Sequence, residues 1–111
     1  MANIPAAIVT LQDNVDADGN GNVLDIISGM ETANIEIAST STDAVVNFEA
    51  QVSTTDWFAV NGVNLSNFNV ATSPVATDSI YQIDLIGLSA LRCRISSITS
   101  GNVTVVARVV G

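Results

Sequence analysis

The chain has 111 residues, of which 48% are hydrophobic and only 13% are charged. This length fits one domain, and the apolar share is sufficient for a buried core, so we expect an ordered globular fold without a second domain. Eleven carboxylates outnumber three basic residues, which gives a formal net charge of −8. Because such a surface repels phosphate groups, nucleic acids and anionic membranes are poor candidate partners.

The residue types that most often carry acid–base catalysis near neutral pH are missing from this chain. It contains no histidine, and its three basic residues are all arginines, Arg92, Arg94 and Arg108. Catalysis of this kind depends mostly on histidine and sometimes on a lysine with a shifted pKa. The carboxylates are spread along the chain without a local cluster. We therefore expect that the protein is not an enzyme and needs no cofactor.

Cysteine usage and the N-terminus bear on where the protein is made. Cys93 is the single cysteine, so no intrachain disulfide can form, and without a histidine to activate it we interpret it as a small core hydrophobe. The N-terminal sequence lacks the basic start and apolar stretch of a signal peptide. No apolar segment approaches the ~20 residues of a membrane span. We expect a soluble protein that is made in a cytoplasm.

Short segments rich in Val, Ile and Thr alternate with turn residues along the chain, which is typical of a sandwich or barrel of many short strands. In chain order, the expected strands are residues 4–12, 23–27, 32–38, 44–52, 57–63, 68–71, 79–86, 91–99 and 103–110. One weak segment is expected to belong to a loop, which leaves about eight strands. We predict an all-β, single-domain antiparallel β-sandwich over residues 8–111, after an N-terminal arm over residues 1–7. Jelly-roll and immunoglobulin-like topologies both remain open.

Alternation of apolar and polar residues predicts which face of each strand is buried. The side chains that we expect to point inward are Val46, Phe48, Ala50 and Val52, then Tyr81, Ile83 and Leu85, and Ala33, Ile35 and Ile37. Each of these strands should contribute one face to the core.

The last two expected strands are predicted to form a hairpin around residues 100–102. A three-residue loop there keeps the apolar residues of both strands on one face, which a two-residue loop does not. These residues are Cys93, Ile95, Ala107 and Val109. The same register places Arg94 directly opposite Arg108, with Arg92 two residues away. All the positive side-chain charge of the chain would then lie on one hairpin face.

Like charges on paired strands repel one another, so these arginines need negative neighbours. Internal salt bridges to carboxylates such as Asp84 or Glu49 would supply them, and so would an acidic partner surface. Both possibilities remain open. If an acidic partner surface supplies the negative charge, the candidate partner contacts are Arg92, Arg94 and Arg108.

Two local patterns suggest binding sites. Residues 16–22 match the opening of a calcium loop, but the twelfth position counted from Asp16 is Ile27 instead of a glutamate, and the flanking segments read as strands. A polar turn is therefore favoured and no metal site is assigned, with a calcium-stabilised loop as the weaker alternative. Trp57 and Phe58 follow a turn; we expect one of the pair to lie in the core.

Five blocks of strand and turn residues follow one another along the chain: VNFE (46–49), DWFAVNGVNL (56–65), YQIDLIGL (81–88), LRCRIS (91–96) and TSGNVTV (99–105). In this order, the blocks resemble a family of small virion proteins of tailed bacteriophages and prophages. The resemblance covers most of the chain from Val23 onward. It implies a β-sandwich that serves in a phage particle as a capsid decoration protein, a head-fibre base or a tail-associated module, and it carries over no catalytic residue.

We therefore expect a virion structural protein, made in the host cytoplasm, that decorates the capsid by binding the major capsid protein or neighbouring virion proteins. A homo-oligomer is expected, with a trimer as the first guess. The uncharged N-terminal arm, with Ile4 and Pro5, is expected to dock against the shell or another subunit. The alternative is a carbohydrate- or receptor-binding module of a head or tail fibre, in which Trp57 or Tyr81 stacks on a sugar.

Overall fold

The computed structural model describes residues 6–53 and 56–111 of the chain. In this part of the chain the backbone forms strands and no helix, and so no helix that is long and apolar enough to span a membrane. The strands are β1 (Ala6–Val15), β2 (Leu24–Asp25), β3 (Thr32–Ser39), β4 (Val45–Gln51), β5 (Phe58–Ala59), β6 (Gly62–Asn64), β7 (Val70–Ala71), β8 (Ser79–Asp84), β9 (Ala90–Ser97) and β10 (Val103–Val110).

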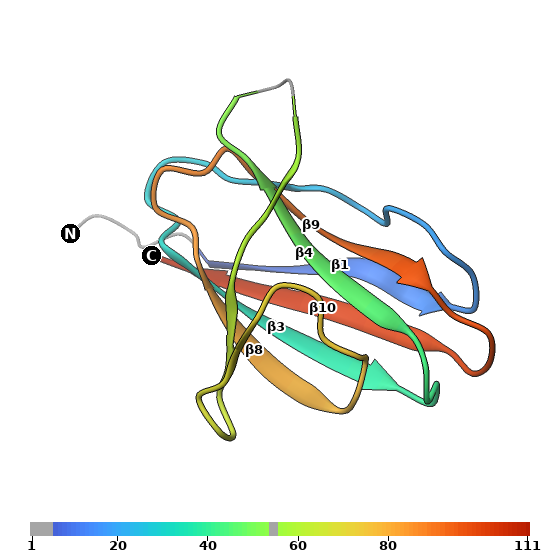
Figure 1. Cartoon of the computed structure of the whole chain (residues 1–111). Coiled ribbons are helices and arrows are strands. Elements are labelled where there is room, and N and C mark those ends of the chain that lie inside the picture. The colour runs from blue at the N-terminus through green and yellow to red at the C-terminus, as the bar shows by residue number, and fades with distance from the viewer. Residues whose placement is uncertain (1–5, 54–55) are drawn as a thin grey trace.

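These strands form two antiparallel sheets that pack face to face (Figure 1). One sheet has six strands in the order β1-β10-β3-β8-β6-β7, and the other has four in the order β2-β9-β4-β5. The predicted all-β sandwich is confirmed. Several of the ten strands contain only two residues, which explains why the sequence indicated a smaller number.

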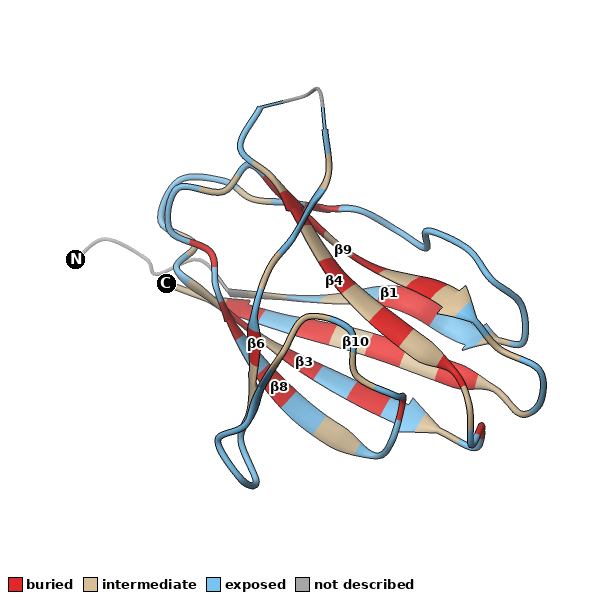
Figure 2. Cartoon of the chain, in the orientation of Figure 1, coloured by how far each residue is buried: buried red, intermediate tan, exposed pale blue. Residues whose placement is uncertain are grey.

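The core lies between the two sheets and is built from alternate residues of the long strands. Figure 2 shows buried residues alternating with half-buried or exposed ones along β3, β4 and β8. Nine of the ten predicted inward-facing side chains are buried: Ala33, Ile35, Ile37, Val46, Phe48, Ala50, Tyr81, Ile83 and Leu85. Val52 is exposed instead, because β4 ends at Gln51 and the alternation does not continue beyond it.

The predicted hairpin between the last two strands is wrong. β9 pairs with β4 and β2 in the four-stranded sheet, whereas β10 pairs with β1 and β3 in the six-stranded sheet. The chain crosses from one sheet to the other between Ser97 and Val103. Cys93, Ile95, Ala107 and Val109 are all buried as expected, but they face the core from opposite sides. An apolar alternation fits both arrangements, since each buries the same residues.

Two other boundaries differ from the sequence-based expectation. The expected strand 57–63 is divided into β5, which pairs with β4, and β6, which pairs with β8 in the other sheet. At the N-terminus, Ala6 and Ala7 begin β1 and pair with Val110 and Val109, so the sandwich starts two residues earlier than expected. The remaining residues of the expected arm, 1–5, lie outside the described residues.

One close contact in the core requires glycine. Gly62 in β6 is buried against the ring of Phe48, which also packs on Tyr81 with ring centroids 5.2 Å apart. A Cβ atom at position 62 would lie 2.7 Å from Cε2 of Phe48 and 3.3 Å from Cβ of Tyr81. The absence of a side chain at Gly62 therefore lets β6 lie against the aromatic pair.

We predict that Gly62→Ala lowers the free energy of unfolding by about 1–3 kcal/mol, because the added methyl group overpacks this part of the core. Gly19→Ala is the matched control, since a Cβ there meets no atom within 4 Å. Both changes restrict the unfolded chain alike, so the control should be neutral or slightly stabilising. Urea unfolding followed by circular dichroism measures both. Equal stability of the two variants would contradict the close contact.

Candidate functional site

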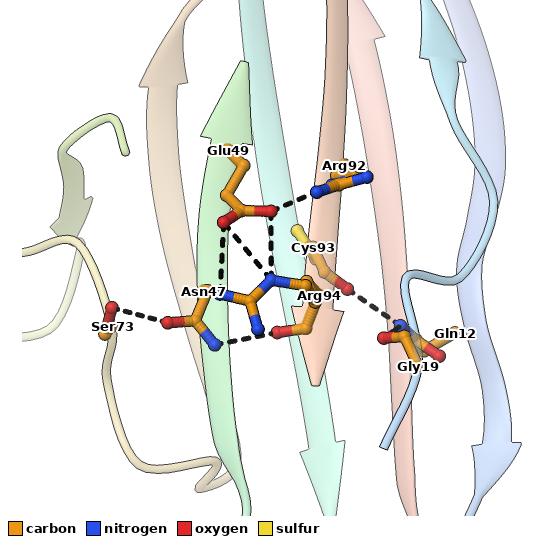
Figure 3. Close-up of polar contacts among 8 residues, drawn as sticks. All are labelled: Gln12, Gly19, Asn47, Glu49, Ser73, Arg92, Cys93 and Arg94. Atoms are coloured by element: carbon orange, nitrogen blue, oxygen red, sulfur yellow. Dashed lines mark hydrogen bonds and ion pairs between the residues drawn. The ribbon is translucent and has the colours of Figure 1, made fainter. Parts of the chain in front are cut away.

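A cluster of three charged side chains lies on the outer face of the four-stranded sheet (Figure 3). Glu49 on β4 is the register partner of Arg92 on β9, and Arg94 is two residues further along β9. Nε of Arg92 donates to Oε1 of Glu49 at 2.8 Å. Arg94 donates through Nε at 3.1 Å to Oε1 and through Nη2 at 3.1 Å to Oε2. One carboxylate thus binds two guanidinium groups.

Neighbouring segments partly cover this cluster. The ring of Trp57, which precedes β5, stacks on the guanidinium of Arg92, whose central carbon lies 4.2 Å from the ring centroid. Only 14% of the Glu49 side chain and 15% of the Arg92 side chain are exposed, whereas 34% of the Arg94 side chain is exposed. Charges that are shielded in this way interact more strongly than charges in open water. The cluster therefore links β4, β9 and Trp57, the residue before β5, through side-chain contacts.

The pKa of Glu49 reflects this arrangement. Partial burial by itself raises the pKa of the carboxyl, but the hydrogen bonds and positive charges of Arg94 and Arg92 outweigh it, so the pKa lies below its ordinary value. Glu49 consequently stays ionised well into the acid range. Two arginines and one glutamate leave one uncompensated positive charge at this place.

The three arginines do not share one face, contrary to the prediction from the sequence. Arg92 and Arg94 lie in the four-stranded sheet, whereas Arg108 lies on β10 in the six-stranded sheet. The error follows from the incorrect hairpin, which had placed Arg94 opposite Arg108. Of the two acidic neighbours that we considered, Glu49 pairs with Arg92 and Arg94, and Asp84 forms no ion pair with them among the described residues.

Arg108 has a different environment on the outer face of the six-stranded sheet. There it lies with four apolar residues around one shallow depression, which we call the outer patch: Ile8, Leu65, Ile80, Val106 and Arg108. Ile8 is 70% exposed, Ile80 is 46% exposed and Leu65 is 38% exposed. Asn34 and Glu36 of β3 complete the lining. The lining thus combines apolar side chains with one positive charge, on Arg108, and one negative charge, on Glu36.

The outer patch is built by the pairing of four strands. Ile8 on β1 is the register partner of Arg108, and Thr10, two residues further along β1, pairs with Val106. Ile80 on β8 pairs with Glu36, and Leu65, directly after β6, donates its backbone N–H to the carbonyl of Ile80. The patch could not be predicted from the sequence, because the four apolar residues come from separate segments and their proximity depends on the strand order.

The proposed sugar-stacking role of Tyr81 is wrong. Tyr81 is only 7% exposed and packs against Phe48 in the core, which agrees with the inward position predicted from alternation. Trp57 is half-buried, and the guanidinium of Arg92 occupies one face of its ring. Phe58 is exposed, so neither residue of the pair at 57 and 58 lies in the core. The two-residue strand β5 is too short and too near the sheet edge to bury them.

Gln12 is a buried polar residue that the sequence did not single out. Its side-chain amide donates to the carbonyl oxygen of Cys93 at 2.8 Å and to that of Gly19 at 3.1 Å (Figure 3). The backbone of Gly19 also pairs with Ile95 on β9. Gln12 thereby ties the loop between β1 and β2 to the four-stranded sheet. Two register shifts in β1 flank Gln12, so simple alternation gave no signal for its inward position.

The remaining candidates can be placed briefly. The cysteine Cys93 is fully buried, which raises the pKa of its thiol and agrees with the interpretation as a core hydrophobe. In the loop at residues 16–22, Gly21 adopts a positive φ close to the carbonyl of Leu11. Across the described ranges, no three Asp, Glu, Cys or His residues are grouped so that they could hold a metal ion. Ile4 and Pro5 lie outside the described residues.

We predict that Glu49→Gln lowers the free energy of unfolding by about 1–2 kcal/mol at pH 7, because two partly buried arginines lose their counter-charge. The pKa of Glu49 is lower in the folded protein than its ordinary value of 4.5. Its contribution is therefore fully present above about pH 4.5 and is lost as the pH falls through the lowered folded-state pKa. The stability difference from the wild type should shrink accordingly in acid.

Urea titrations of both proteins at several pH values measure this difference. Glu36→Gln serves as the control, since Glu36 is exposed and forms no ion pair among the described residues. Its stability should change by less than about 0.5 kcal/mol. A Glu49→Gln variant that matches this control at pH 7 would mean that the cluster does not stabilise the fold.

Two solved structures are similar to this chain over its full length. The SPBc2 prophage-derived protein YomS matches with a TM-score of 0.90 at 22% sequence identity, and the match covers 100% of this chain and 97% of YomS. The PBSX exported protein XepA matches with a TM-score of 0.93 at 19% identity, and this chain spans 39% of its length. At such low identities these likenesses show a shared fold.

Sequence comparison gives a family. No curated protein sequence matches the chain significantly. The model of the XepA family, however, matches residues 6–109, which is nearly the whole sandwich. The chain therefore belongs to the XepA family.

Proposed function

We propose that this chain is a structural protein of a bacteriophage or prophage particle, without enzymatic activity, that acts by binding a neighbouring virion protein through the outer patch. In its specific form, the proposal is that the protein decorates the capsid by binding the major capsid protein. It would be made in the host cytoplasm and reside in the virion.

The exposure of the outer patch carries this proposal. Ile8, Ile80 and Leu65 present apolar surface to solvent on one sheet face in a chain whose net charge is −8. Contiguous exposed apolar surface commonly marks a protein–protein contact. Arginine is also enriched in such contacts, and Arg108 lies among these apolar side chains.

The names of the two structural neighbours support the proposal of a phage or prophage particle. One structural neighbour is named as derived from the SPBc2 prophage and the other as an exported protein of PBSX. We also propose that the protein forms a homo-oligomer, for which the trimer expected from the sequence is a first hypothesis. The docking role of Ile4 and Pro5 stays a prediction. No observation favours the glycan-binding alternative, since Tyr81 is buried and Arg92 covers one face of Trp57.

We predict that the protein copurifies with phage particles released from the strain that carries its gene, and that it lies on the head surface. Density-gradient purification followed by mass spectrometry and immunogold microscopy measures both. Particles that lack the protein would refute the virion role, and labelling at the tail tip alone would refute capsid decoration.

The contribution of the outer patch is tested with two matched substitutions of exposed isoleucines. Ile80→Asp places a charge in the patch, and Ile27→Asp places the same charge in the loop between β2 and β3. We expect Ile80→Asp to be lost from particles and Ile27→Asp to be retained. Ile8 is a poorer choice, because an aspartate beside its register partner Arg108 would create a new ion pair. Equal retention of both variants would show that the patch is not the contact.

A further inference from the structure

Arg108 differs from the other two arginines in having no carboxylate partner within the described part of the chain. Arg92 and Arg94 share the carboxylate of Glu49, whereas Arg108 forms no ion pair with any described carboxylate. Its side chain is exposed on the outer face of the six-stranded sheet. Its register partners on the neighbouring strands are Ile8 on β1 and Asn34 on β3, and neither has a negative charge.

Glu36 is the acidic residue in the lining of the same depression. It pairs with Val106 on β10 and so lies diagonally across from Arg108, at a spacing that long side chains can bridge. The two nevertheless form no ion pair. The positive charge of Arg108 is therefore available to a partner.

A partner that covers the apolar residues Ile8, Val106 and Ile80 also removes water from the guanidinium group between them. Loss of that water is costly unless the partner supplies an opposite charge with good geometry. A carboxylate meets this need best, because a guanidinium binds it through two parallel hydrogen bonds. An uncharged or basic surface would offer the arginine no carboxylate besides Glu36, with which it forms no ion pair.

We infer that the partner of the outer patch is a protein surface that places an aspartate or glutamate side chain against Arg108, inside a ring of apolar contacts. This inference rests on the proposed function and adds the chemistry of the partner. A second copy of this chain fits less well, since a face-to-face pair would bring two Arg108 side chains and two net charges of −8 together.

The first test measures binding of the purified chain to particles from a strain in which its gene is deleted, by cosedimentation. Arg108→Gln should weaken binding about 30-fold or more, because the partner carboxylate is then buried without its counter-charge. Asp25→Asn, at an exposed position of β2 in the four-stranded sheet and outside the outer patch, is the control and should bind like the wild type. Both residues are exposed, so melting temperatures should confirm that both variants fold.

The second test uses the absence of lysine from the chain. Arg108→Lys keeps the positive charge and introduces the single lysine side chain. A carbodiimide joins such an amine directly to a carboxylate that it contacts. We expect this variant on the particles to be coupled to an aspartate or glutamate of a virion protein, which peptide mass spectrometry identifies. Ser96→Lys, on the outer face of the four-stranded sheet, is the control and should give no such product.

The outcomes separate this inference from the proposed function. If the wild type does not bind the particles, the proposed function is wrong. If the wild type binds and Arg108→Gln binds equally well, the contact is elsewhere and the carboxylate inference is wrong. Coupling of the Arg108→Lys variant to Glu36 of another copy would identify the occupant as the chain itself and would also overturn the inference.

Discussion

Burial of one face of each sheet against the other is the constraint on which the rest of this structure depends. Strands β3, β4, β8, β9 and β10 each place alternate apolar residues in the shared core. The inward faces are thereby used for stability, and the charged and amide side chains of these strands lie on the outer faces. Cys93 is a reactive residue that lies inward, where its thiol is completely buried. Any binding role is consequently left to the outer faces and the loops.

The two outer faces differ in how far the chain itself covers them. On the four-stranded sheet, the carbonyl groups of Thr72 and Pro74 accept backbone hydrogen bonds from β4, and Gly19 pairs with β9 at the other side. Trp57 covers Arg92, and the hydroxyl of Ser73 donates to the side chain of Asn47 (Figure 3). Glu49, Arg92, Arg94 and Asn47 thus have partners within the chain, so this polar cluster stabilises the sheet.

Much of the fold could be predicted from the sequence, because alternation of apolar residues depends only on which side of a strand is buried. Phe48, Ile35 and Ile83 were assigned to the core for that reason and are buried. The assignment of strands to sheets could not be predicted in the same way. Consecutive strands such as β9 and β10 bury the same residues whether they pair as a hairpin or face each other across the core. Only long-range pairing distinguishes the two arrangements.

The unknown assignment of strands to sheets also limited the prediction of the candidate site. The sequence identified all three arginines and named Glu49 as a possible counter-charge, since charge can be counted without knowledge of the fold. It did not separate Arg108 from Arg92 and Arg94, because that separation follows from the sheet assignment. The outer patch could not be predicted from the sequence either, because Ile8 and Ile80 are brought to one face by strands that are distant in the sequence. The register of the sheet, and not the local pattern, creates the patch.

The outer faces of the two sheets differ in the surroundings of their arginines. Around Glu49, both arginines bind the same carboxylate and Trp57 covers Arg92, so a partner that bound there would have to compete with existing contacts. Around Arg108, the charge forms no ion pair within the described residues, and the exposed apolar side chains of Ile8 and Ile80 line the same depression. A partner gains both the burial of apolar surface and a new ion pair there, without first breaking a contact within the chain. The six-stranded sheet is therefore the face on which association gains most.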